Sequence, residues 1–226
     1  HSTFTIDMKG NARLCAWDTS PTVEIGGISG ESGTYIMGSS KNTKNFTCTW
    51  KVGYANTNET FKGKINSWSC SGSGYTGTVN ITKVGTGDWR LTGSNDYKGT
   101  TSIAGGRLIV NGTNSGTGQV IVAADATLAG KGTVAGKVTV MADATVYAGD
   151  TLINSQTLKL TGGCTINEGG AVEVPLYSSN GATKCNRLQV TGNFQIDGAT
   201  LRLNMSETEG IKNDASFYIF NLSGAT

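Results

Sequence analysis

The feature that most constrains this chain is a ten-residue pattern that occurs twice, 18 residues apart. Residues 119–128 read Gln-Val-Ile-Val-Ala-Ala-Asp-Ala-Thr-Leu, and residues 137–146 read Lys-Val-Thr-Val-Met-Ala-Asp-Ala-Thr-Val. Both copies place apolar residues at the second, fourth and tenth positions. Weaker copies at 157–166 and 187–196 keep the same apolar positions. A repeat of roughly 20 residues built from short alternating strands predicts a solenoid of stacked coils.

Composition agrees with this architecture. Glycine is abundant at 33 residues, proline is scarce at 2, and charged residues make up only 15% of the chain. Such a composition is typical of short strands joined by tight turns, with little helix. We therefore expect an all-β fold of about 10 coils with parallel pairing between coils, because one coil alone has too little apolar surface to be stable. Strand-like pieces occur at 4–6, 13–17 and 46–50, where the periodicity is poor, and period-two alternation predicts strands at 59–63, 79–83, 89–93, 100–104 and 107–111.

Regularity changes along the chain. Residues 1–77 are expected to form irregular N-terminal coils, and residues 78–226 to form regular repeats. A loop rich in Ser, Asn and Gly near 175–186 does not fit the repeat and is predicted to be inserted into one coil. We expect one continuous domain that is a fragment of a longer protein.

Five cysteines, an odd number with no CxxC pair, argue against a zinc or redox site. The separation of Cys48 from Cys70, and that of Cys164 from Cys185, is close to the length of one predicted coil. Residues one coil apart lie about 5 Å from each other, so two stacked structural pairs are predicted, close enough for disulfides. A ladder of buried thiols is the equal alternative. Cys15 is left over in either arrangement.

The segment from residue 89 to residue 150 resembles the autotransporter passenger-associated repeat. Three parts carry the resemblance: Trp89 to Gly99, with Leu-Thr-Gly-Ser-Asn-Asp-Tyr; Gly106 to Gly112, with Leu-Ile-Val-Asn-Gly; and Ala126 to Thr133. The resemblance implies a single-stranded right-handed parallel β-helix, a pectate-lyase-like solenoid, at the surface of a Gram-negative bacterium or outside it. Similar repeats occur in large secreted proteins of gut-type Bacteroidetes, which is the setting we expect.

Catalytic chemistry has few candidates. The only histidine is His1, which leaves no base for a Ser-His-Asp triad and few ligands for zinc. Asp125 and Asp143 occupy equivalent positions in successive repeats and are weak candidates for a shared calcium ion. Each also sits beside a turn, where Asp commonly bonds its own backbone, and this structural interpretation is favoured. Lys131 and Lys137 are candidates for a base by proximity alone.

Aromatic residues in the first half of the chain give a second hypothesis. Trp50, Trp68 and Tyr75 are candidate glycan contacts, because flat rings on a rigid β-surface stack on sugars. The alternative is that these rings pack at the end and corners of the rod. Trp89 belongs to the repeat signature and is expected to be packed.

The sequence as a whole predicts a non-catalytic, structural, adhesin-like segment of a large bacterial cell-surface or secreted protein that contacts glycans. The alternative is part of a β-helix polysaccharide lyase or glycoside hydrolase, which an outward strip of three or more acids with a base would favour. Host or dietary glycans and a host surface protein are the expected partners. A net charge of +2 without a basic stripe predicts no nucleic-acid partner. Without an apolar run near 18 residues, no membrane insertion of this segment is expected, and no cofactor.

Overall fold

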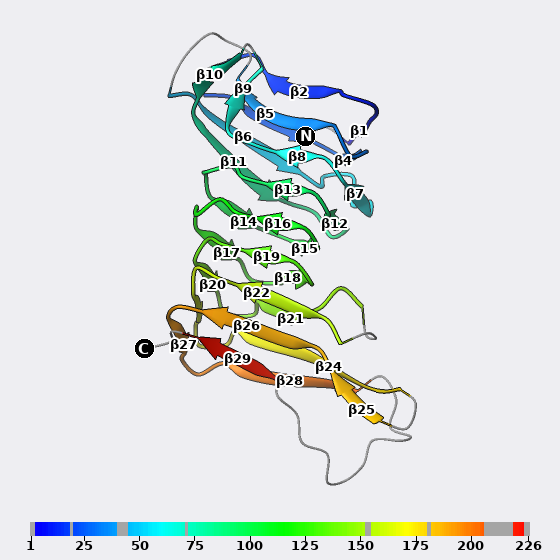
Figure 1. The fold of residues 1–226 in the computed structure, drawn as a ribbon, viewed down its shortest axis with the longest axis vertical. Helices are drawn as coiled ribbons and strands as arrows, with labels where there is room; N and C mark the ends of the chain where they lie inside the picture. Colours follow the sequence, from blue (N-terminus) through cyan, green and yellow to red (C-terminus); the bar gives the residue numbers. More distant parts are fainter. Residues whose placement is uncertain are drawn as a thin grey trace.

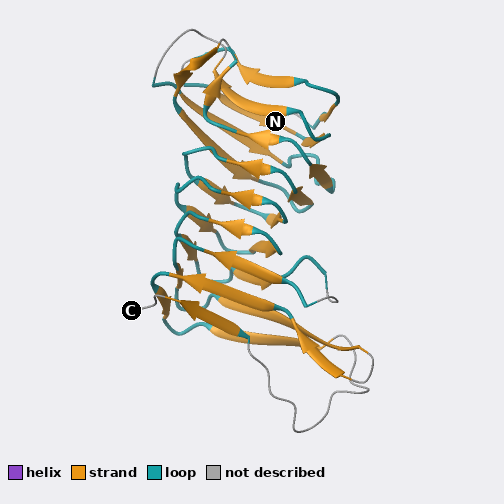
Figure 2. Cartoon of the chain, viewed as in Figure 1, coloured by secondary structure: helices purple, strands orange, loops and turns teal. Residues whose placement is uncertain are grey.

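The protein consists of stacked β-strands wound around one long axis, as a computed structural model shows (Figures 1 and 2). No helix occurs among the described residues. The structure describes residues 3–18, 20–39, 45–70, 72–151, 155–179, 182–205 and 219–223. Side chains are outside the description at 72–75, 178–179, 182–183 and 205.

Three long sheets and two short ones contain all the described strands. The ten-stranded sheet contains β1 (Thr5–Met8), β4 (Gly27–Gly30), β7 (Glu59–Phe61), β12 (Asp88–Leu91), β15 (Gly106–Val110), β18 (Ala126–Gly130), β21 (Thr145–Ala148), β24 (Ala171–Ser179), β25 (Ala182–Cys185) and β28 (Thr200–Met205). The eight-stranded sheet contains β3 (Thr22–Ile25), β6 (Thr47–Val52), β11 (Thr78–Lys83), β14 (Thr101–Ile103), β17 (Val120–Val122), β20 (Val138–Val140), β23 (Cys164–Ile166) and β27 (Phe194–Ile196). The six-stranded sheet contains β13 (Ser94–Asn95), β16 (Thr113–Asn114), β19 (Thr133–Val134), β22 (Thr157–Leu160), β26 (Arg187–Thr191) and β29 (Phe220–Ser223). The short sheets contain β2 (Arg13–Ala16), β5 (Tyr35–Ser39) and β8 (Lys64–Ile65), and the pair β9 (Trp68–Ser69) and β10 (Gly72–Thr76).

Successive coils pair in parallel, which confirms the predicted parallel β-helix. In one turn the chain passes from β15 through β16 and β17 to β18, and so contributes a strand to each long sheet. The leading repeat has the predicted register, because Val120 faces Val138 and Thr127 faces Thr145, so that equivalent positions of the two copies lie side by side. Antiparallel pairing occurs between β9 and β10 and between β24 and β25 in the described part of the chain.

The weaker repeat copies do not continue the leading repeat in one register. The copies at 157–166 and 187–196 stack on each other. The first of them is offset from 137–146, because Val138 faces Cys164 rather than Leu158, and this coil is therefore longer than the one before it. The extra residues lie between β21 and β22, where the chain makes an excursion before it rejoins the stack.

The stacked cysteine pairs are wrong. Cys48 faces Val79 in the next coil, and Cys164 lies between Val138 and Phe194. Cys70 instead forms a disulfide with Cys15, with 6.3 Å between their Cα atoms. Coils of unequal length explain the error, since a separation of one repeat places two cysteines above each other only where the coil has that length.

Cys48, Cys164 and Cys185 are buried thiols. The alternative prediction, a ladder of buried thiols, is therefore right about the burial of these three side chains. It is wrong about their stacking, because Cys185 lies on β25 and not above another cysteine in a neighbouring coil. Burial raises the pKa of Cys48 and of Cys164 to about 12, so both remain protonated at neutral pH.

The segment predicted as an inserted loop near 175–186 is a hairpin. β24 runs on beyond the coil, and Leu176 pairs with Cys185 on β25. Figure 1 shows this hairpin extending sideways from the lower end of the rod. The predicted division of the chain at residues 77 and 78 stays a prediction.

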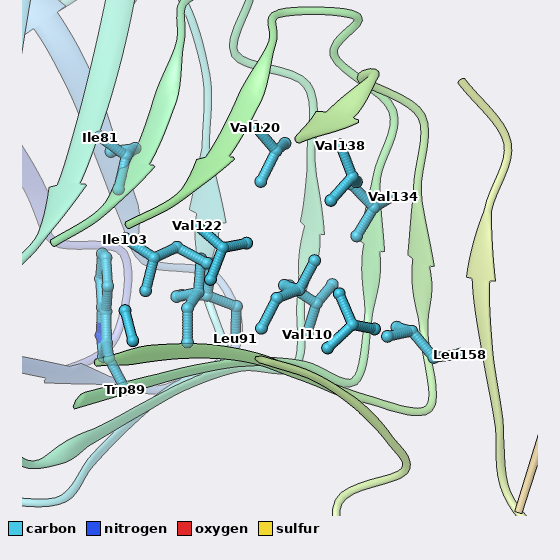
Figure 3. Close-up of a cluster of buried hydrophobic side chains, with 14 of the residues drawn as sticks. Ile81, Trp89, Leu91, Ile103, Val110, Val120, Val122, Val134, Val138 and Leu158 are labelled. Carbon is cyan, nitrogen blue, oxygen red and sulfur yellow. The ribbon is translucent and has the colours of Figure 1, made fainter. Parts of the chain in front are cut away.

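Inward side chains form one continuous apolar core (Figure 3). Alternation in each strand places every second residue inside, and the register aligns these residues into columns along the axis. One column contains Leu108, Leu128, Val146 and Val172 on successive strands. All four are almost fully buried, and each such side chain contributes about 1.5–3 kcal/mol of stabilisation.

A lysine interrupts one of these aliphatic columns. Lys83 is 1% exposed, and its ammonium donates to the carbonyl oxygens of Val84 (2.7 Å), Gly85 (3.0 Å) and Gly105 (3.1 Å). Burial lowers the pKa of Lys83 to about 8, and the negative charge of Asp88 opposes this only in part. The Lys83 ammonium therefore links the turn at Val84 and Gly85 to the turn at Gly105 in the next coil, and burial of its charge costs desolvation free energy.

Leu128→Ala should lower the free energy of unfolding by about 2–5 kcal/mol, because the lost methyl groups leave a cavity between two rungs. Urea denaturation measures the effect. Met141→Ala is the control, since this side chain is 41% exposed and its loss should change stability by less than about 0.5 kcal/mol. Equal effects of the two substitutions would contradict a core made of stacked columns.

Wild-type stability should rise relative to that of Lys83→Met as the pH increases from about 8 to 10.5. The pKa of Lys83 is about 8 in the folded chain and has its ordinary value of 10.5 in the unfolded chain. Between these two pH values the unfolded state binds more protons than the folded state, so the free energy of unfolding rises with pH. The relative gain should be on the order of 3 kcal/mol, measured by urea denaturation at each pH. Subtracting the variant cancels the titration of thiols and phenols, and parallel pH profiles would rule the prediction out.

Candidate binding surface

Trp50 cannot be a glycan contact. It is 1% exposed, and its indole Nε1 donates to the carbonyl oxygen of Met37 at 2.8 Å. In β6 the buried positions alternate, and Trp50 occupies one of them. Trp89 is packed as expected, and its Nε1 donates to the carbonyl oxygen of Ile28 at 2.9 Å.

Trp68 is available at the surface, unlike Trp50. Its side chain is 42% exposed, and the ammonium of Lys64 lies 5.5 Å from the ring centroid. The same ammonium forms an ion pair with Asp96 at 2.7 Å. Tyr75 belongs to β10, but its side chain lies outside the described residues. Its predicted role as a glycan contact stays a prediction.

Asp125 and Asp143 lie one coil apart, as the repeat predicts. The backbone N–H of Asp125 donates to the carbonyl oxygen of Asp143 at 3.1 Å, and both residues are exposed. Both have left-handed φ, 61° and 60°, a conformation that Asp tolerates better than most residues. These backbone angles explain the Asp at each corner without an ion. No group of three His, Cys, Asp or Glu able to hold a metal occurs in the described ranges.

A charged strip that the sequence did not indicate runs along the outer face of the ten-stranded sheet. In β12, Trp89 and Leu91 point into the core, so Asp88 and Arg90 point outward. The register places Arg107 beside Asp88, and the two form an ion pair at 3.4 Å. The long side chains of this strip therefore contact each other across rungs.

The Gly149–Thr151 segment lies across this strip. Gly149 pairs with Gly130 at the end of β18 through two backbone hydrogen bonds. The carboxylate of Asp150 accepts hydrogen bonds from Arg90 at 2.9 Å and from Asn111 at 2.7 Å. Three rungs therefore hold one excursion of the chain in place.

Buried amides hold the same segment from the other side. The side-chain oxygen of Gln156 accepts from the backbone N–H of Asp150 at 2.6 Å, and Asn186 donates to the carbonyl oxygen of Thr151 at 3.1 Å. Asn186 also accepts from the backbone N–H of Gln156 at 2.8 Å. Both amide side chains are buried, so these bonds form where water does not compete.

The Arg90–Asp150 pair fixes the charge state of the carboxylate. Burial would raise the pKa of Asp150, but the hydrogen bonds from Arg90 and Asn111 outweigh it and hold this pKa below its ordinary value. The same bond raises the pKa of Arg90. Asp150 is therefore an ionised acceptor at neutral pH and not a proton donor.

Between the strip and the segment lies a hollow of about 350 Å³. It is lined by Arg107, Thr127, Thr145, Tyr147, Asp150, Thr151 and Glu173. The guanidinium of Arg107 lies 5.4 Å from the centroid of the Tyr147 ring. Burial and the negative charge of Glu173 raise the pKa of Tyr147, so its phenol keeps its proton.

The hollow was not predicted from the sequence, because the candidate acids, Asp125 and Asp143, were those at equivalent repeat positions. Asp150 lies outside the repeat, in the residues that make the coil from Val138 to Cys164 longer than the coil from Val120 to Val138. That lengthening is visible in the sequence as a break in the period. Lys131, a candidate base for Asp125 and Asp143, lies instead near enough to Asp150 to help lower its pKa.

Comparison with known proteins supports the resemblance found in the sequence. Residues 81–110 match the family model of the passenger-associated-transport-repeat. These residues include β12 to β15, so the match covers one coil of the β-helix and the start of the next coil. A search of curated proteins found no significant match. The matched repeat is one associated with passenger segments, which are secreted or exposed at the cell surface. No helix in the described residues is long and apolar enough to cross a membrane.

Arg90→Met should lower the free energy of unfolding by about 1–3 kcal/mol at neutral pH, because it leaves the Asp150 carboxylate, 11% exposed, without its cation. Urea denaturation of both proteins measures the loss. Since the pKa of Asp150 is lowered in the folded state, this contribution is present above the ordinary value of 3.8 and disappears as the pH falls through the folded value.

Lys51→Met is the matched control for this prediction. This substitution removes the ion pair between Lys51 and Glu24, whose side chains are 35% and 29% exposed, respectively. It should lower the free energy of unfolding by less than Arg90→Met does, because the pair is more exposed to water. Equal losses in the two variants, or a loss for Arg90→Met that persists in acid, would contradict the role given to Asp150.

Proposed function

We propose that this chain is a non-catalytic, adhesin-like structural segment of a large secreted or surface protein of a Gram-negative bacterium. The observation that carries the proposal is the core, whose aliphatic columns continue from rung to rung and support a stiff rod. Such a rod holds attached regions at a distance from the cell. The repeat match at residues 81–110 supports an extracellular place for it.

The state of the outward carboxylates supports a role without catalysis. Asp150 is paired with Arg90, Asp88 with Arg107, and Glu173 accepts from Asn204 at 2.8 Å. A general acid needs a raised pKa and a free proton, whereas the pKa of Asp150 is lowered. These acids therefore have partners that hold them at the surface.

One observation favours the enzymatic alternative. Asp88, Asp150 and Glu173 lie on one outward strip with Arg90 and Arg107, which is the arrangement expected of a β-helix polysaccharide lyase or glycoside hydrolase. Arginine as the base would have to lose a proton that its ion pair with a carboxylate holds. We therefore rank this function second.

Glycan contact is the proposed binding activity of the rod, and host surface proteins are the second class of partner. The exposed ring of Trp68 supports the first, because it offers a flat apolar face beside a hydrogen-bond donor.

Incubation of the chain with a panel of neutral and acidic polysaccharides should release no new reducing ends and no unsaturated uronates. Chromatography of the products after overnight incubation gives the measurement. Product release that disappears in Asp150→Asn but persists in Asp125→Asn would establish the enzyme and overturn the proposal. Asp125 is the matched control because it is an exposed acid of the same rod that does not line the hollow.

A further inference from the structure

The shape of the hollow follows from the sizes of side chains in two neighbouring columns. Arg107, Thr127 and Thr145 follow each other in register, so a long side chain is succeeded by two short ones. In the adjacent column Tyr147 is followed by Glu173. The threonines thus form a low floor, with Arg107 at one end and Tyr147 and Glu173 along one side.

The hollow extends along the rod. Its lining comes from β15, β18, β21 and β24, which are successive rungs, and from the Gly149–Thr151 segment. Three rung intervals of about 4.8 Å give a length of roughly 14 Å. A volume of about 350 Å³ is at the lower end of the range for small-molecule sites. The hollow can therefore hold one or two sugar-sized rings lengthwise.

The lining is held rigid before any ligand arrives. Asp150 is fixed by Arg90 and Asn111, and Glu173 is fixed by Asn204. The four hydrogen bonds from Arg90 and Asn111 occupy the acceptor positions of Asp150, whereas Glu173 accepts from Asn204 and still presents lone pairs, because a carboxylate has about four acceptor positions. A rigid acceptor of this kind loses little entropy when a ligand binds.

The hollow offers both donors and acceptors. Arg107 donates only, Glu173 accepts only, and the hydroxyls of Thr127 and Tyr147 do both. No hydrogen bond to either hydroxyl is formed within the described part of the chain. A ligand that both donates and accepts at closely spaced positions would satisfy this set, as the hydroxyl groups of a sugar ring do.

Charge selects against the other small ligands. Two carboxylates and one guanidinium line the hollow, and because Arg90 pairs with Asp150, phosphate or a uronate would face the remaining carboxylate of Glu173 at close range. A metal cation or an amine gains little, because Arg90 already neutralises Asp150. The balance favours a ligand without net charge.

We infer that this hollow is a binding site for a neutral saccharide, which lies along the rod between the Gly149–Thr151 segment and the Arg107–Tyr147 pair. The inference rests on the proposed function in one respect, since it assumes that the rod contacts glycans. It assigns that contact to residues of the hollow, which follow β12 in the sequence, whereas Trp68 precedes β12.

Isothermal titration calorimetry tests the site with defined probes: cellobiose, mannobiose, xylobiose and lactose as neutral disaccharides, and digalacturonate as the acidic one. At least one neutral disaccharide should bind with a Kd below about 10 mM, and digalacturonate should bind at least tenfold more weakly. Thr127→Trp, which fills the floor, should weaken binding of the neutral probe at least tenfold.

Thr133→Trp is the matched control, because Thr133 is also an outward threonine but belongs to the six-stranded sheet. It should leave the affinity unchanged. Tyr147→Phe keeps the ring and removes the hydroxyl, and should weaken binding about threefold. Circular dichroism spectra and melting temperatures that match the wild type show that each variant is folded.

Three results would overturn the inference: no neutral probe binding below about 10 mM, tighter binding of digalacturonate, or equal effects of Thr127→Trp and Thr133→Trp. These results are separate from the fate of the proposed function. Failure of every probe to bind removes the site and leaves the structural rod, whereas release of products from polysaccharides removes the non-catalytic role and leaves the site.

Discussion

Burial of one coil by the next is the interaction on which the whole rod depends. A coil of three short strands has inward apolar residues but no opposite layer to cover them, and the neighbouring coils provide that layer. The last described rungs show the dependence directly. Leu201 and Leu203 continue the columns of Val172 and Val174, yet they are 46% and 45% exposed, because no described rung lies beyond them. Position in the stack decides burial.

Stacking also determines what the outer surface can do. Strict register places outward residues in columns, so a run of side chains along the axis is set by one position in successive repeats. A straight column makes a ridge or a flat face. An excursion such as the Gly149–Thr151 segment adds height beside a column of short residues, and the hollow lies between them. The break in the period is thus the source of the candidate site on this face.

Alternation in the sequence predicts the strands well, since the pieces at 79–83, 89–93 and 107–111 correspond to β11, β12 and β15. The register of the leading repeat is equally predictable, because it needs only neighbouring, nearly identical coils. The cysteine pairing could not be predicted, since it required coil lengths that differ between the pairs Val120–Val138 and Cys48–Val79. Trp50 shows a different limit: composition marked it as an aromatic candidate, but the alternation of β6 places it inside.

The ion pair between Arg90 and Asp150 links the shape of the hollow to its chemistry. It fixes the excursion of the chain on the sheet, and without that excursion the threonine floor would be an open surface. It also lowers the pKa of the carboxylate, which removes the proton a hydrolytic acid would need. A site organised in this way can hold and orient a polyhydroxylated ligand, while its acid Asp150 is already bound by Arg90 and Asn111. The recognition without turnover that we propose would therefore depend on the same contact that builds the site.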